Sequence, residues 1–204
     1  MNWFLQGMLD AAGEILKSPF KDSSIWWLLA PIIVLWFVLE IYFGRYKGES
    51  LGWNTSLGNG ISLVWINIEG LRFLFSSHPE PFLFRFIPLT LILAYGCFII
   101  YISFTHKLSS RATYILASPT PVYFLSSVSA LWSHGVLDLT WFVVIDLIIL
   151  YLILTCIFTV IRKLLPEVSE SEKGRFDVGK SSSEETSGLE SELGKEKGLG
   201  NLKL

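Results

Sequence analysis

Long apolar stretches follow one another between residues 24 and 165, with short polar loops between them. A helix needs about 20 mainly apolar residues to cross the hydrocarbon of a bilayer. The pattern predicts about five transmembrane helices, at 24–43, 55–75, 88–105, 112–134 and 138–163. The predicted fold class is therefore an all-α integral membrane protein.

Prolines and polar residues suggest where several of these helices begin or break. Pro88 and Asp138 are predicted to begin the third and fifth helices, because both residue types suit a first helical turn. The sequence SPTP at 118–121 interrupts the fourth stretch, which is also rich in small residues that allow close packing. We expect a broken fourth span. The alternative is a re-entrant segment, which protein would have to shield from lipid.

The first 23 residues have a different pattern, because apolar side chains recur at helical spacing with polar ones on the other side. This segment is too polar to span a membrane. Residues 1–23 are predicted to form an amphipathic helix that lies in the membrane interface and ends at Pro19. The alternative is an ordinary helix that packs on the transmembrane part.

Residues 166–204 are rich in Ser, Glu, Lys and Gly and contain almost no aromatic side chains. Such a segment cannot bury enough apolar surface to offset the entropy of ordering its backbone. The sequence therefore predicts a disordered acidic tail.

Composition supports a membrane protein and argues against some other classes. Mean hydropathy is +0.52 and aromatic residues make up 15% of the chain, which is more apolar surface than a soluble domain hides. Residues 1–165 are close to neutral and the rest is acidic, so nucleic acid is not an expected partner. Cys97 and Cys156 lie inside apolar stretches and are expected to behave as small hydrophobic residues.

Basic residues next to the predicted spans indicate an orientation. Three flanks on one side carry six of them: Arg45, Lys47, Lys107, Arg111, Arg162 and Lys163. The two loops on the opposite side carry only Arg85. By the positive-inside rule, the C-terminal tail lies in the cytoplasm and the N-terminus outside, in a plasma-type cell membrane. The expected partners are the lipid bilayer and either another membrane protein or further copies of this chain.

The stretch 55–75 is unusual because it carries polar and charged residues within an apolar helix. At 100° per residue, Ser62 and Glu69 fall on one stripe of this helix, with Asn59 on one side and Arg72 on the other. We call these four residues the polar seam. Charged side chains at this depth normally face a protein interior or a wet cavity. The seam is therefore predicted to face the other helices.

A second acidic residue lies at a comparable depth in the fifth span. At about 1.5 Å per residue, Glu69 and Asp146 are similarly far from the outer ends of their helices. We therefore predict that Arg72 bridges Glu69 and Asp146. His134 and Asp138 lie at the same face, and Glu40, near the end of the first span, is expected to reach toward Arg45 or Lys47. The candidate binding residues are Asn59, Ser62, Glu69, Arg72, His134, Asp138 and Asp146.

Three classes of function fit this pattern. The first is a non-enzymatic subunit or scaffold whose polar seam serves helix packing and partner contact. The second is a permeation protein for an ion or small solute that uses Asn59, Ser62 and Glu69. The third is an enzyme acting on a lipid-linked substrate at the outer face with Glu69, Asp138, His134 and Arg85. No nucleotide-binding loop, nucleophile motif or metal-ligand spacing occurs in the sequence, so no cofactor or metal is predicted.

Overall fold

The computed structural model describes residues 3–46 and 52–166, and in these residues it contains helices and no strands. The elements in chain order are α1 (Trp3–Lys21), the short 3₁₀ helix η1 (Ser23–Ile25), α2 (Trp26–Arg45), α3 (Trp53–Ser77), α4 (Phe82–Thr105), α5 (Ser110–Leu116), α6 (Pro119–Ser133) and α7 (Trp141–Leu164). Except for Pro166, the predicted acidic tail lies outside the described residues, as does Lys47.

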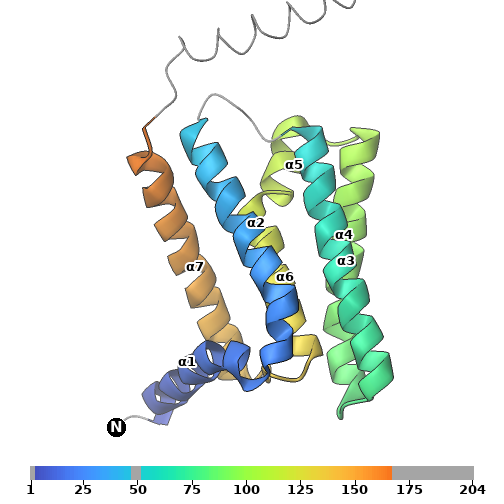
Figure 1. The fold of residues 1–204 in the computed structure, drawn as a ribbon, viewed down its shortest axis with the longest axis vertical. Coiled ribbons are helices and arrows are strands. Elements are labelled where there is room, and N and C mark those ends of the chain that lie inside the picture. Colours follow the sequence, from blue (N-terminus) through green and yellow to red (C-terminus); the bar gives the residue numbers. More distant parts are fainter. Residues whose placement is uncertain (1–2, 47–51, 167–204) are drawn as a thin grey trace, which may run out of the picture. The chain divides into compact units, whose positions relative to one another are not determined.

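The long helices run side by side with alternating direction (Figure 1). Helix α6 is central, because α2, α3 and α4 all pack on it. Helix α3 packs most extensively on α4, and α7 packs on α1 and α2. In consequence, the C-terminal ends of α2, α4 and α7 share one end of the bundle with the start of α3 (Figure 1).

Three helical segments of the described chain are long and apolar enough to cross a membrane, namely Ser23–Arg45, Phe82–Thr105 and Trp141–Leu164. Helix α3 has sufficient length, at 25 residues, but its polar residues lower its hydropathy. Helix α6 has only 15 residues, and two residues separate it from α5. The fold is thus all-α and compatible with a membrane, and three of the five expected spans meet these criteria.

Two predicted helix starts are wrong. Helix α4 begins at Phe82, six residues before Pro88, because Pro81 has an extended backbone and stands at the helix boundary. Helix α7 begins at Trp141, and the hydroxyl oxygen of Thr140 accepts a hydrogen bond from the Val143 N–H. Asp138 is not the cap of α7. The break predicted at SPTP is confirmed, since α5 ends at Leu116 and α6 starts at Pro119.

Helix α1 continues through Pro19 instead of ending there. Proline lacks the N–H that would bond to the carbonyl oxygen four residues earlier. Here that oxygen belongs to Ile15, and the Ser18 hydroxyl donates to it at 2.8 Å. The helix therefore reaches Lys21 with the missing bond replaced.

Helix α1 has three faces. One packs on α7, where a Cβ on Gly7 would lie 2.9 Å from the Phe142 ring. A second face is apolar and exposed, and consists of Leu5, Leu9, Leu16 and Phe20. The third is polar and consists of Asp10, Glu14, Lys17 and Lys21. Packing on α7 agrees with the alternative given for this segment, an ordinary helix that packs on the rest of the protein.

Glycines allow α3 and α4 to approach closely. A Cβ added to Gly60 would lie 2.9 Å from Ile99 Cγ2 and 3.1 Å from the backbone nitrogen of Ile100. A Cβ on Gly96 would lie 2.8 Å from Val64 Cγ2. Small residues at such contacts favour helix association in membranes, because they bring the backbones together. This packing holds α3 in place and orients its polar seam.

Candidate functional site

The first residue of the polar seam along α3, Asn59, faces α6. Asn59 is buried, and its side-chain amide donates to the backbone oxygen of Ala117 at 2.7 Å. Its carbonyl accepts a hydrogen bond from the Tyr123 hydroxyl at 2.9 Å. Asn59 thus ties α3 to the break before α6 and to α6 itself. Both bonds are made inside the protein.

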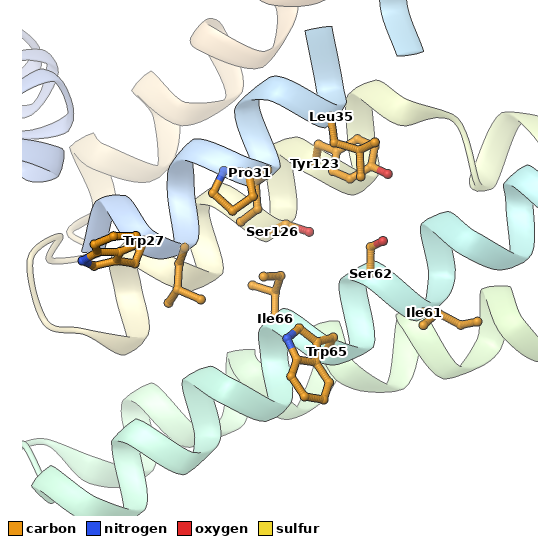
Figure 2. A pocket seen from close by; sticks show the side chains of 11 residues that line it. Trp27, Pro31, Leu35, Ile61, Ser62, Trp65, Ile66, Tyr123 and Ser126 are labelled. Carbon is orange, nitrogen blue, oxygen red and sulfur yellow. The ribbon is translucent and has the colours of Figure 1, made fainter. Parts of the chain in front are cut away.

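Beside this contact lies a cavity of about 400 Å³ between α2, α3 and α6, which we call the α2–α3 groove (Figure 2). Helices α2 and α3 both pack on α6 but scarcely touch each other in the described chain, and this leaves the groove open between them. It is lined by Trp27, Leu28, Pro31, Ile32, Leu35, Ile61, Ser62, Trp65, Ile66, Tyr123 and Ser126. The hydroxyls of Ser62 and Ser126 point into it from opposite sides (Figure 2).

The charged part of the polar seam lies nearer the end of α3. The Arg72 Nε donates to Glu69 Oε2 at 2.8 Å, and a second Arg72 nitrogen contacts the other carboxylate oxygen. The imidazole of His134 stacks on Phe73 with ring centroids 4.1 Å apart, which places it beside the same end of α3. The structure therefore brings Glu69, Arg72 and His134 together at one end of the bundle.

Asp138 belongs to a different group of side chains at that end. Its Oδ1 accepts a hydrogen bond at 3.1 Å from Arg85, whose side chain is only 8% exposed. Arg85 also donates to the Trp132 backbone oxygen at 2.9 Å and lies over the Trp132 ring. Gly135, at φ +71°, brings the loop between α6 and α7 against this guanidinium. Arg85 therefore holds the loop, and Asp138 neutralises its charge.

The predicted bridge through Arg72 does not form. Among the described residues Arg72 makes its ion pair with Glu69, and 70% of its side chain is exposed. Asp146 is buried on α7, and its Oδ2 has no hydrogen-bond partner in the described chain. The bridge fails because α3 packs on α4 and α6, whereas α7 packs on α1 and α2. Similar depth in the membrane did not make these residues neighbours.

The sequence reading missed a buried charged group at the opposite end. Glu40 is 1% exposed, and its Oε2 lies 2.7 Å from an Arg162 nitrogen. Its Oε1 accepts a hydrogen bond from the Thr120 hydroxyl at 2.6 Å. We call these three residues the Glu40 clasp, which joins α2, α6 and α7. The expectation that Glu40 reaches toward Arg45 or Lys47 is therefore wrong, because its carboxylate turns inward.

No metal centre or family assignment adds to this picture. Within residues 3–46 and 52–166, no three or more His, Cys, Asp or Glu side chains are grouped so that they could hold a metal ion. Comparison with protein-family models, with curated proteins and with solved structures found no match.

Proposed function

We propose that this chain is a non-enzymatic subunit or scaffold of a membrane, whose polar residues serve helix packing and partner contact. The observation that carries the proposal is the placement of Asn59. An intramembrane amide that faced a pore or a substrate would have to leave bonding groups free for it. Asn59 instead makes hydrogen bonds within the chain through both its amide nitrogen, to the Ala117 backbone oxygen, and its amide oxygen, from the Tyr123 hydroxyl.

The arrangement of charges supports a structural role as well. Arg85 bonds to Asp138 and Trp132, and Arg72 bonds to Glu69. Each cation is thus already engaged with a group of the same chain. The enzyme alternative would need Glu69, Asp138, His134 and Arg85 at one substrate, and their separate pairing counts against it. The permeation alternative would need Asn59, Ser62 and Glu69 to line one open path, and the bonds that Asn59 makes inside the protein count against that.

The proposed topology has five crossings, formed by α2, α3, α4, α5 with α6, and α7. Their alternating direction supports it (Figure 1). Basic residues support it as well, because they lie at or next to the C-terminal ends of α2, α4 and α7 and the start of α5: Arg45, Lys107, Arg111, Arg162 and Lys163. We place that end in the cytoplasm of a cell bounded by a plasma-type membrane, with the N-terminus outside. Helix α1 would then lie at the outer interface, with Leu9 and Leu16 toward lipid.

The experiment combines a packing variant with a search for partners. Asn59→Leu should lower the free energy of unfolding by about 1–3 kcal/mol, because the Ala117 carbonyl and the Tyr123 hydroxyl lose their partner. Asn54→Leu, at an exposed position of the same helix, is the matched control.

The chain purified in mild detergent should have a fixed stoichiometry with a second membrane protein or with itself, measured by native mass spectrometry.

Two results would contradict the scaffold role. The first is a well-behaved monomer that conducts an ion or solute into liposomes and loses the flux in Glu69→Gln. The second is a monomer that turns over a lipid-linked substrate and loses the activity in the same variant. If Asn59→Leu were as stable as Asn54→Leu, the packing role of the polar seam would be rejected.

A further inference from the structure

Helix α3 has a narrow stripe that the rest of the described chain leaves exposed. Between Trp53 and Phe75 the exposed positions follow one another at alternating steps of four and three residues: Asn54, Gly58, Ile61, Trp65, Ile68, Arg72 and Phe75. This is the spacing with which one helix contacts another along a seam. We call the last five residues, from Ile61 to Phe75, the α3 stripe.

The exposed face of α7 is different, because it suits lipid. In the middle of α7 the exposed positions come in adjacent pairs of apolar side chains: Ile148 with Ile149, Leu152 with Ile153, and Cys156 with Ile157. Hydrocarbon covers such a broad apolar face without any polar contact. The α3 stripe is narrower, and it carries the charged residue Arg72 with Glu69 at its edge.

The ion pair on the α3 stripe is directed toward the middle of the proposed span. An arginine near the end of a membrane helix usually extends its side chain outward, so that its charge reaches the interface. The Arg72 Nε instead donates to Glu69 Oε2 at 2.8 Å, and a second Arg72 nitrogen contacts the other oxygen of that carboxylate. Glu69 lies about 12 Å along the helix from the end of α3 at Ser77. The guanidinium is therefore held beside a carboxylate inside the span.

Lipid is a poor cover for this ion pair. The Arg72 side chain is 70% exposed and that of Glu69 is 27% exposed. A guanidinium has five N–H groups, of which Arg72 uses two on Glu69, and the carboxylate keeps further lone pairs. Hydrocarbon offers no partner to these groups, so a charged pair that faces it is costly. A fitting cover must bring both an acid and a base to this depth.

We propose that a second copy of this chain covers the α3 stripe. Two copies related by a two-fold axis along the membrane normal bring the same surface of each together. Each copy then adds its own Glu69 and Arg72 at the same depth, so four charges of alternating sign sum to zero. A different partner would need an acid and a base of its own at matching positions, whereas a second copy has them by symmetry. This dimer rests on the scaffold role and names the partner that the role requires.

Charge reversal tests the pairing between the two copies. Glu69→Arg gives the stripe two cations, and Arg72→Glu gives it two anions. Energy transfer between donor- and acceptor-labelled full-length chains in liposomes measures their association. Each variant should associate with itself more than about 30-fold more weakly than the unaltered chain does, because like charges meet in the interface. A mixture of the two variants should regain most of the association, because opposite charges meet again.

Lys163→Glu is the matched control for charge reversal, because Lys163 is exposed on α7 outside the α3 stripe. It should leave the association of the chain with itself unchanged. The dimer would be rejected if Glu69→Arg and Arg72→Glu each associated with themselves as strongly as the unaltered chain, or if their mixture failed to associate.

Cysteine cross-linking locates the contact in a chain that keeps both charges. With Cys97 and Cys156 replaced by alanine, Ile68→Cys should form a disulfide-linked dimer in membranes after mild oxidation. The reason is that a two-fold contact brings a residue next to its own copy. Leu152→Cys, on the exposed face of α7, is the matched control and should cross-link at least about tenfold less. Equal cross-linking at the two positions would overturn the proposal.

These measurements separate the dimer from the scaffold role. A chain that binds another membrane protein through the α3 stripe, and does not associate with itself, would overturn the dimer and leave the scaffold role in place. A monomer that carries out transport or catalysis would overturn both.

Discussion

At the scale of single residues, most charged side chains inside the bundle are paired within the chain. Glu40 with Arg162 and Arg85 with Asp138 join different helices, and Glu69 with Arg72 joins successive turns of α3. Removing one member of a buried pair leaves an uncompensated charge, which costs far more than removing both. The Glu40 clasp is the most buried of the three, since the Glu40 side chain is 1% exposed.

The clasp gives a test of this logic. Arg162→Met should lower the free energy of unfolding by about 3 kcal/mol, toward the low end for a buried pair because Arg162 is partly exposed. The double variant Glu40→Gln, Arg162→Met should regain most of this loss. Thermal unfolding in detergent measures both. Lys163→Met, at the exposed neighbouring position, should change the free energy of unfolding little. If Arg162→Met lowered the free energy of unfolding no more than Lys163→Met does, the clasp would contribute nothing to stability.

At the scale of helices, close packing between α3 and α4 depends on glycine. Gly60 faces the backbone of α4, whereas Gly58 on the same helix has no atom within 4 Å of an added Cβ. Both positions gain the same helix propensity when glycine is replaced. The difference in stability between the same substitution at Gly60 and at Gly58 therefore isolates the contact with α4.

The matched pair is Gly60→Leu and Gly58→Leu. We expect Gly60→Leu to destabilise the protein by about 1–3 kcal/mol relative to Gly58→Leu, because the backbone of Ile100 cannot move aside as a side chain can. Chemical denaturation in mixed micelles gives the difference. Should the two variants unfold together, α3 and α4 would not be in close contact.

Helix α1 gives a second prediction at this scale. Nitroxide labels at Leu9 and Leu16 should be accessible to oxygen dissolved in the lipid, and labels at the adjacent Asp10 and Lys17 should be accessible to a water-soluble nickel chelate. All four positions are exposed, so burial does not explain a difference. The labels require replacement of the free cysteines Cys97 and Cys156 by alanine. If all four labels were equally accessible to the nickel chelate, α1 would be surrounded by water on both faces and would not lie on lipid.

At the scale of the whole molecule, the helical architecture could be predicted from the apolar stretches, and the break before Pro119 from its prolines. The partners of the polar residues could not. Depth along a helix paired Glu69 with Asp146, but depth says nothing of which helices are neighbours. The same argument, applied to α2 and α7, would have pointed to Glu40 and Arg162, because both lie near the ends of spans that exit on one side. Two helix starts were missed because the boundary residue of α4 is Pro81, seven residues before Pro88, and that of α7 is Thr140, two residues after Asp138.

The crossing of the membrane by α3 is the step on which this topology depends, because α3 is long but carries Glu69 and Arg72. Single cysteines at Gly52 and Ser77, both exposed, mark its two ends in a chain without native cysteines. A membrane-impermeant maleimide, applied to intact cells and to inverted vesicles, reports on which side of the membrane each of the two cysteines lies. Five crossings predict that Gly52→Cys reacts only from the cytoplasmic side and Ser77→Cys only from outside. Labelling of both from the same side would show that α3 does not cross, and would contradict both the proposed topology and a membrane-buried polar seam.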